Sequence, residues 1–251
     1  SGNDEFVRIA EAFNAMAANI EELINSVYVE GLQKKQAELE ALQAQINPHF
    51  LYNTLSTISS LANLGETKKA TEMIQRLSRY YRLTLNKGNV HISFALELEQ
   101  VDTYLNIQRV KYADAFTVYY DIEPDVMNAQ VIKLILQPFV ENVFKHAWFG
   151  DTITIRITGR VTDGRIELKV IDDGIGMPPE QVKRMMEGPS HAGGYGVKNV
   201  DERIKLRYGP EYGVRIRSVR GGGTAVQMLL PAFGGMRGEF ASEAESLEKY
   251  A

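Results

Sequence analysis

The sequence of 251 residues contains no cysteine, a single tryptophan and only four histidines. Without cysteine the protein cannot form disulfides, thiolate nucleophiles or sulfur-ligated metal sites, which suits a reducing compartment. No stretch reaches the run of about 18 to 20 consecutive apolar residues that a membrane span requires. The first residues, SGNDEF, do not resemble a signal peptide. We therefore expect the chain as given to be soluble and cytoplasmic.

An excess of charge of either sign is also missing. The formal net charge is −4, and acidic and basic residues are interspersed along the chain. Such a chain offers no broad basic surface to phosphate backbones, so nucleic-acid binding is not expected. The four histidines lack metal-ligand spacing such as His-Glu-x-x-His, so a histidine-bound metal is not expected either. With 44% hydrophobic residues, the chain can form one large domain or two modest ones, and we expect two.

The N-terminal part shows the apolar spacing of a coiled coil. Apolar residues recur every three or four positions from Phe6 to Val27, and a second such seam runs from Leu32 to Ile46. The two seams are out of phase across Gly31. The pattern predicts a long helix with a break in register near Gly31.

The stretch QINPHFLYNTL, residues 45 to 55, places Pro48 directly before His49. An interior proline removes one helical hydrogen bond and bends the helix. Because the apolar seam continues through Ile46 and Leu51, we expect one helix with a bend at Pro48. The alternative is that Pro48 begins a new helix, where proline is harmless.

The pattern beyond Pro48 predicts a helical hairpin. The apolar stripe continues to Ala62, the residues NLGE at 63–66 interrupt it, and a second helix begins near Thr67 and ends before Gly88. Two helices bury little surface alone, so two hairpins are expected to pair into a four-helix bundle. Residues 31–90 are therefore predicted to form a homodimer.

The pattern changes after Gly88. Ser93 can cap a helix, FTVYYDI alternates like a strand, and AQVIKLILQPFVENVFKHAW is predicted to be one helix. Two strands follow, joined by a turn at Asp163-Gly164, then a helix from about Pro179, a helix at VKNVDERIKLRY and a terminal hairpin. This order favours an α+β fold, a two-layer sandwich with helices on one face of a mixed sheet. The last residues, 233–251, are treated as a tail.

Three glycine-rich segments lie in this second part: DDGIGM from Asp172, GGYGVKN from Gly193 and RGGGT from Arg220. Each alone is typical of a turn. Together they indicate a nucleotide, because glycines allow close approach of a backbone and a glycine loop before a helix offers N–H donors to phosphates.

The helix segment PFVENVFKH carries polar residues on an otherwise apolar background. The amide oxygen of Asn142 can ligate Mg²⁺, and Lys145, one turn on, can neutralise phosphate charge. His146 lies one turn from Asn142 as well. Glu141 can equally be part of a solvated edge.

The same motifs, in this order, resemble the ATP-binding domain shared by histidine kinases, type II topoisomerases, Hsp90 and MutL, the Bergerat fold. More closely, residues 40–231 resemble the LytS/YesM group of bacterial sensor histidine kinases. EFVRIAEAFNAMAANIEEL resembles a helix of a HAMP signalling domain. The resemblance implies four parts, a HAMP-like helix at 1–30, a dimerisation and phosphotransfer hairpin at 31–90, an ATP-binding domain at 91–232 and the tail. It also implies the cytoplasmic portion of a bacterial plasma-membrane protein, whose membrane segments are absent from this chain.

The resemblance implies roles for individual residues. His49 matches the phospho-accepting histidine, and Asn142 matches the residue that holds Mg²⁺ between the ATP phosphates. Without the family, His49 would be read as a solvated helix histidine. Further nucleotide contacts match at Lys145, His146, Asp172 (adenine amino group), Gly174 and Gly176 (the loop under the ring), Gly194 and Gly196 (the lid) and Thr224. Ala147 departs from the glycine that often follows this histidine.

The implied function is an ATP-dependent protein-histidine kinase that passes its phosphoryl group to an aspartate on a response regulator. Phe50 follows His49 where many histidine kinases have an acidic residue, so Glu141 or water stays open as the base. Asn53, one turn on, could orient water for dephosphorylation. The alternatives are an ATP-hydrolysing machine like Hsp90 or MutL, which places a glutamate where this chain has Pro138, and a non-catalytic ATP-binding regulator.

Overall fold

The computed structural model describes residues 47–85, 90–148, 150, 152–187 and 195–232. These residues divide between two compact units, one ending at Tyr52 and one beginning at Asn53, and each is described by itself. The predicted coiled-coil seams, the break at Gly31, the HAMP-like helix, the tail and Gly194 lie outside the described residues. Within the described ranges no helix has both the length and the apolar character needed to cross a membrane.

Helix α2 (Pro48–Asn63) begins at the proline. The side-chain oxygen of Asn47 accepts a hydrogen bond from the N–H of Phe50 (3.2 Å), and the Asn47 carbonyl accepts one from Leu51 (3.1 Å). Asn47 is therefore an N-cap, and Pro48 takes the first helical position, where its missing N–H has no helical partner to lose. The expected bend at Pro48 within one continuous helix is wrong, because a capped helix starts there.

Helix α3 (Thr67–Leu85) buries Ala70, Met73, Leu77 and Tyr80, as the apolar stripe predicted. It packs along α4 (Phe94–Tyr112), whose N-cap is Ser93, also as predicted. The second predicted helix of the hairpin thus lies in the same compact unit as the sheet that follows it. The geometric boundary falls between residues 52 and 53, whereas the sequence placed a boundary after residue 90.

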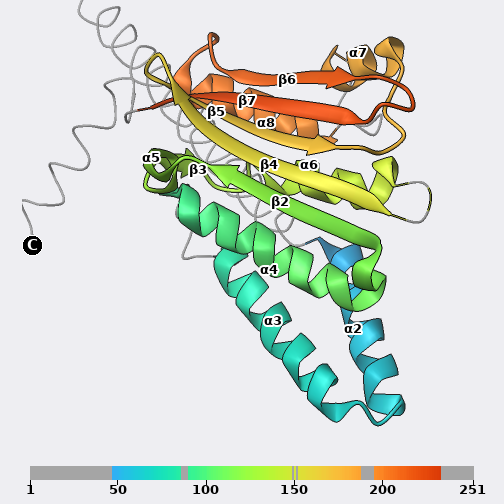
Figure 1. Ribbon diagram of the computed structural model, residues 1–251. Helices are drawn as coiled ribbons and strands as arrows, with labels where there is room; N and C mark the ends of the chain where they lie inside the picture. Colours follow the sequence, from blue (N-terminus) through green and yellow to red (C-terminus); the bar gives the residue numbers. More distant parts are fainter. Residues whose placement is uncertain (1–46, 86–89, 149, 151, 188–194, 233–251) are drawn as a thin grey trace, which may run out of the picture. The chain divides into compact units, whose positions relative to one another are not determined.

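Five strands form the main sheet in the order β2-β4-β5-β7-β6 (Figure 1). They are β2 (Phe116–Ile122), β4 (Ile153–Thr162), β5 (Arg165–Asp172), β6 (Gly213–Ser218) and β7 (Thr224–Pro231). β2 pairs parallel with β4, and all other pairs are antiparallel. The predicted turn between β4 and β5 is confirmed, with positive φ at Asp163 and Gly164, as a tight hairpin requires.

One face of the sheet forms the core with the helices. Side chains alternate between buried and partly exposed along β4, β5 and β7, so that Ile155, Leu168 and Met228 are fully buried. Figure 1 shows α6 and α8 behind this sheet. Helices α6 (Gln137–Asn142) and α8 (Tyr195–Tyr208) contact each other, and α8 packs on β6 and β7. The predicted α+β two-layer sandwich is confirmed.

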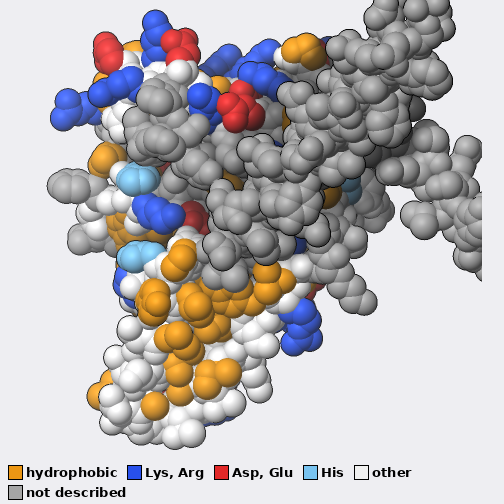
Figure 2. All heavy atoms as spheres, turned by 180° about the vertical axis from the view of Figure 1, so that it is seen from behind, with side chains coloured by type: hydrophobic (Ala, Val, Ile, Leu, Met, Phe, Trp, Pro, Cys, Tyr) orange, Lys and Arg blue, Asp and Glu red, His pale blue; other side chains and the backbone are white. Residues whose placement is uncertain are grey.

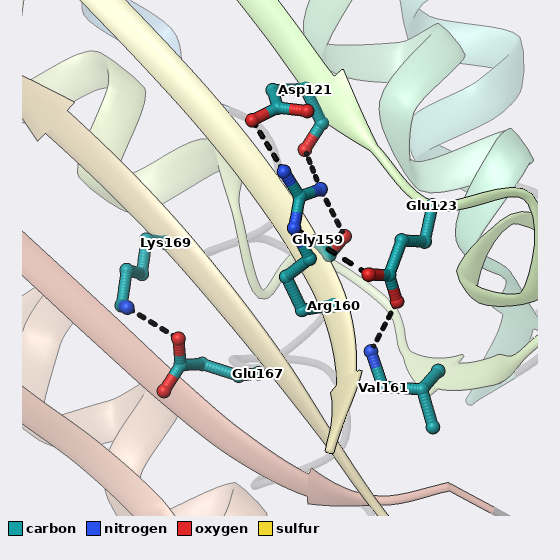
Figure 3. Close-up of polar contacts among 7 residues, drawn as sticks. All are labelled: Asp121, Glu123, Gly159, Arg160, Val161, Glu167 and Lys169. Carbon is teal, nitrogen blue, oxygen red and sulfur yellow. Dashed lines mark hydrogen bonds and ion pairs between the residues drawn. The ribbon is translucent and has the colours of Figure 1, made fainter.

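Charged side chains of β2, β4 and β5 form ion pairs and hydrogen bonds on the other face of the sheet (Figure 3). Arg160 on β4 bonds the carboxylate of Asp121 (2.5 Å), and Glu123 accepts a hydrogen bond from the N–H of Val161 (2.8 Å). The Arg160 hydrogen bond lowers the pKa of Asp121. These contacts join the edge strand β2 and the residue after it to β4.

The predicted helix over residues 129–148 is wrong in its first part. Residues Gln130–Ile132 form strand β3, which pairs antiparallel with β1 (His91–Ser93). The buried carboxylate of Glu97 then accepts hydrogen bonds from the N–H groups of Leu134 (2.8 Å) and Leu136 (2.9 Å). This side chain from α4 satisfies N–H groups at the start of α6, so the helix begins only at Gln137. The remaining elements are η2 (Ala113–Ala115), α5 (Pro124–Met127), a π-helical turn (Val143–Ala147) and α7 (Pro179–Glu187).

Candidate functional site

A cavity of about 550 Å³ opens between the core face of the sheet and helices α6, α7 and α8. Most of its wall is apolar, with Val143, Ile175 and Val226 among the lining residues. An apolar pocket with a few convergent polar groups is the usual form of a small-molecule site. The polar side chains that line it are Asn142, His146, Asp172, Gln181, Arg184 and Thr224.

Asn142 and His146 reach the cavity from an irregular part of the helix. Asn142 is the last residue of α6, and His146 belongs to the π-helical turn that follows without interruption. Single π turns inside helices occur frequently at functional sites. The turn brings both side chains to the cavity wall, as the sequence predicted for a shared ligand.

Asp172 and Thr224 form the last rung between β5 and β7, where both strands reach the cavity. The Asp172 carboxylate accepts a hydrogen bond from the N–H of Gly174 (3.0 Å). Burial raises the pKa of Asp172, and the hydrogen bonds from the Gly174 and Thr224 backbones act in the opposite direction. A partly buried carboxylate of this kind is a strong acceptor for a ligand N–H donor.

The two glycines after Asp172 are held against protein backbone. A Cβ atom on Gly174 would lie 2.3 Å from the carbonyl oxygen of Ala147, and one on Gly176 would lie 1.9 Å from that of Val219. Gly176 also has a φ of +61°, which disfavours any side chain. The absence of side chains at these glycines therefore makes room for protein backbone rather than for a ligand. The loop is clamped between the π turn and the β6–β7 connection.

The sequence did not predict three residues that line or support the cavity. Gln181 and Arg184 reach the cavity from α7, one turn apart. The hydroxyl of Ser218 accepts a hydrogen bond from the N–H of Met177 (2.8 Å) and lies 2.9 Å from the Thr224 hydroxyl. Helical spacing in the sequence could have placed both residues on one face of α7. Which face of α7 points to the cavity depends on the tertiary structure. Ser218 carried no signal, because a serine at a strand end is common.

Four predicted site residues that the structure describes between β3 and β7 do not line the cavity: Glu141, Lys145, Gly174 and Gly196. The ammonium group of Lys145 pairs with the carboxylate of Glu141 (2.9 Å), and Glu141 also accepts a hydrogen bond from Gln137 (2.8 Å). Gly196 lies in the first turn of α8 rather than in a loop, and a Cβ there would sit 3.2 Å from the Cβ of Pro138. Gly194, the other expected lid residue, is outside the described part of the chain.

His49 and Asn53 both lie on α2, one turn apart. His49 belongs to the unit that ends at Tyr52, and the cavity belongs to the other. The carbonyl of Asn53 accepts a hydrogen bond from the hydroxyl of Thr57 (2.9 Å), an ordinary helical contact.

Comparison with known proteins gives two family matches. Residues 37–116 match the model described as "Histidine kinase", and residues 127–233 match "Histidine kinase-, DNA gyrase B-, and HSP90-like ATPase". The sensor histidine kinase YesM of Bacillus subtilis is 34% identical over 230 residues, which cover 91% of this chain and 39% of that protein. The chain belongs to the sensor histidine kinase family of the LytS/YesM type.

Two further matches are of different kinds, a curated sequence and a solved structure. The sensor protein LytS of Enterococcus faecalis is 33% identical over 207 residues, covering 78% of this chain and 34% of that protein. Among solved structures, the histidine kinase domain of the Erythrobacter litoralis blue-light activated kinase EL346 has a TM-score of 0.46 at 15% identity, covering 78% of this chain and 94% of that one. The chain spans less than half the length of these two curated kinases.

The family match also places the cavity. Every polar side chain that lines it, from Asn142 to Thr224, falls within the range of the ATPase-like match. The cavity is therefore the candidate nucleotide site of the kinase's ATPase-like domain.

Proposed function

We propose that this chain is the catalytic part of an ATP-dependent protein-histidine kinase, in which ATP binds in the cavity and His49 accepts its γ-phosphoryl group. One observation carries the proposal. A carboxylate acceptor, Asp172, and an amide ligand, Asn142, line the same largely apolar cavity of about 550 Å³. The first group can accept a hydrogen bond from an adenine amino group, and the second can ligate a cation that is shared with phosphates.

The residues present suit the nucleotide. Asp172 would accept a hydrogen bond from the adenine amino group, with Thr224 beside it on the same rung. The apolar walls would receive the adenine ring, which has two flat apolar faces. Arg184 and His146, also at the wall, would contact phosphates. In this proposal Gly196 belongs to the first turn of α8, close to Pro138, rather than to a loop over the phosphates.

Magnesium fits the donor set as a cation held jointly by protein and phosphate. Asn142 offers an amide oxygen, and Mg²⁺ takes few protein ligands when phosphates and water complete its shell. When bound, Mg²⁺ neutralises phosphate charge. Lys145 would add to this neutralisation by turning from Glu141 to the phosphates; its side chain is 44% exposed, whereas that of Glu141 is 12% exposed.

His49 is suited to accept the phosphoryl group. A neutral imidazole nitrogen is nucleophilic near pH 7; it forms a bond to the γ-phosphorus while the bond from phosphorus to the β–γ bridging oxygen breaks and ADP leaves. The imidazole proton passes to water or to a carboxylate. Because His49 lies in the first turn of α2, the helix N-terminus favours the negative charge that the phosphoryl group brings.

We also propose that the kinase is a homodimer. Leu55 on α2, Leu64 after it and Ile74 on α3 are 47%, 77% and 53% exposed. Figure 2 shows hydrophobic side chains gathered on this part of the molecule. Surfaces of this kind mark interaction sites, and a second copy would cover them in a four-helix bundle. A monomer mass in light scattering, at tens of micromolar protein, would contradict this proposal.

The remaining assignments follow from the family. The phosphoryl group would pass to an aspartate of a response-regulator receiver domain, and Asn53 would orient water for dephosphorylation. Residues 1–30, 31–90 and 91–232 would serve as HAMP-like helix, dimerisation and phosphotransfer region and ATP-binding domain, with membrane attachment through segments that precede this chain. An Hsp90-like or MutL-like hydrolytic role is disfavoured, because Pro138 occupies the position of the glutamate that activates water in those proteins.

The test is phosphorylation of the purified chain with γ-labelled ATP and Mg²⁺. We expect an acid-labile, base-stable phosphate, which is typical of phosphohistidine. His49→Gln should abolish the label while leaving nucleotide affinity in calorimetry unchanged, because the nucleophile does not belong to the cavity wall. Stoichiometric labelling of His49→Gln would exclude His49 as the acceptor. Failure of the wild-type chain to bind nucleotide would exclude the proposed function.

A further inference from the structure

A buried chain of side-chain hydrogen bonds connects α3 with α6. The amide nitrogen of Gln137 on α6 donates to the hydroxyl of Tyr80 on α3 and to the carboxylate of Glu141 (2.8 Å). The amide oxygen of Gln137 accepts from the amide of Gln100 on α4 (2.7 Å), which also donates to Thr84 on α3 (3.2 Å). Three helices thus share one polar network.

Gln137 is the centre of this network. It is 4% exposed, and Tyr80 and Gln100 are each 1% exposed. A buried amide that loses a protein partner finds no water to replace it, so each of its contacts is strongly favoured. Because its two N–H groups serve Tyr80 and Glu141 at once, the position of α3 and the orientation of the Glu141 side chain are tied together.

The network adjoins the cavity wall. Gln137, Glu141 and Lys145 follow one another at i, i+4 and i+8 through α6 and the π turn, so they share a face. Asn142 and His146, each one residue further along, occupy the neighbouring face and line the cavity. A rotation of α6, or a change in the π turn, would therefore alter both faces together.

We propose that Gln137 and Tyr80 are positioning residues that couple α3 to the nucleotide cavity, so that occupancy of the cavity and the placement of α3 change together. The inference rests on the proposed function, because it takes ATP as the occupant. Its consequence is that movement of the helical hairpin reaches Asn142 and His146 through the amide of Gln137. Neither Gln137 nor Tyr80 lines the cavity, so both act through α6.

Neighbouring tyrosines provide a matched pair of variants. Tyr80→Phe removes the hydroxyl that Gln137 contacts. Tyr81→Phe removes a hydroxyl that makes no hydrogen bond in the described part of the chain. The two substitutions delete the same atom from adjacent positions of α3. Gln137→Met, which keeps the side-chain length and removes the amide, is the second test variant.

The experiment is hydrogen exchange of α3 in the full chain, with and without a non-hydrolysable ATP analogue and Mg²⁺, together with calorimetry of analogue binding. In the wild type and in Tyr81→Phe, we expect the analogue to slow exchange of α3 roughly fivefold or more, as a typical coupling between two sites would. In Tyr80→Phe and Gln137→Met this protection should disappear. Because coupling is reciprocal, the analogue should bind these two variants more weakly by a similar factor.

Three results would overturn the coupling. The first is equal protection of α3 in Tyr80→Phe and Tyr81→Phe. The second is lost protection with unchanged analogue affinity. The third is a wild-type chain that binds the analogue without any change in α3, which would leave the proposed kinase function intact. A wild-type chain that binds no analogue would instead remove the proposed function on which the coupling rests.

Discussion

Replacement of Gly176 by alanine should lower the free energy of unfolding, and the local geometry sets the size of this effect. The new Cβ atom would lie 1.9 Å from the Val219 carbonyl oxygen and 2.9 Å from that of Gly223. An ordinary carbon–oxygen contact is about 3.3 Å, so the loop and the β6–β7 connection must move apart by about 1.4 Å. A movement of that size would break the hydrogen bonds that join the loop to the β6–β7 connection.

Two such bonds cross this gap. The N–H of Gly221 donates to the Ile175 carbonyl (2.6 Å), and the N–H of Met177 donates to the Ser218 hydroxyl (2.8 Å). Each contributes about 1 kcal/mol. The positive φ of Gly176 adds about 1 kcal/mol after the gain from a stiffer unfolded chain is subtracted. The total is about 3 kcal/mol, or a fall in melting temperature of about 6 to 12 °C for a domain of this size.

Gly221→Ala is the matched control. Gly221 also has a positive φ, +76°, but a Cβ atom there would meet nothing within 4 Å. It should therefore lose only the backbone contribution of about 1 kcal/mol, about 2 to 4 °C. Thermal unfolding followed by circular dichroism measures both variants. If they melted within about 2 °C of each other, the backbone contacts of Gly176 would not be what requires a glycine.

Two further predictions concern Asp172 and the start of α2. Burial raises the pKa of Asp172 above its usual 3.8. The protonated carboxyl therefore stabilises the native state at low pH, and this stabilisation is lost as the pH rises from 3.8 through the raised pKa of the native state. The Asp172→Asn variant should therefore melt at or above the wild-type temperature at pH 7, and this difference in melting temperature should disappear at about pH 3. The variant should also fail to bind nucleotide in calorimetry. A melting temperature below that of the wild type at pH 7 would refute the stability argument. In urea titrations Asn47→Ala should cost about 1 kcal/mol as a lost N-cap, whereas Pro48→Ala should change stability by less than about 0.5 kcal/mol. A larger loss for Pro48→Ala would restore a structural role for the proline beyond beginning α2.

The sequence predicted the elements that short-range patterns define. The β4–β5 hairpin follows from two alternating runs around Asp163 and Gly164, and α4 follows from its Ser93 cap. The segment from Ala129 was misread because Val131 and Ile132 carry an apolar pattern that suits a buried strand and a buried helix alike. Pairing with β1 and the carboxylate of Glu97, both distant in sequence, decided between them.

The candidate site was predictable as a set of residues but not as a geometry. Asn142, His146, Asp172 and Thr224 stood in recognisable motifs, and the structure brings them to one cavity. Lys145 stood in the same motif, yet its side chain pairs with Glu141 on the neighbouring face of the helix. Lys145 lies one turn after Glu141 and also one turn after Asn142, so helical spacing alone could not decide which of the two neighbouring faces its side chain would join.

The rung between Asp172 and Thr224 has a consequence for exchanging parts between kinases. Strand β5 ends at Asp172 and β6 begins at Gly213, and α7 and α8 come between them in the chain, while β5 and β7 are directly paired. The pairing of β5 with β7 thus does not require a fixed length of the segment between α7 and α8, and doubling a flexible loop adds only about 0.6 kcal/mol of closure entropy. A chimera that exchanged residues 178–194 alone, retaining the clamped loop before them and α8 after them, would keep Asp172 and Thr224 at the cavity and replace the whole segment between that loop and α8.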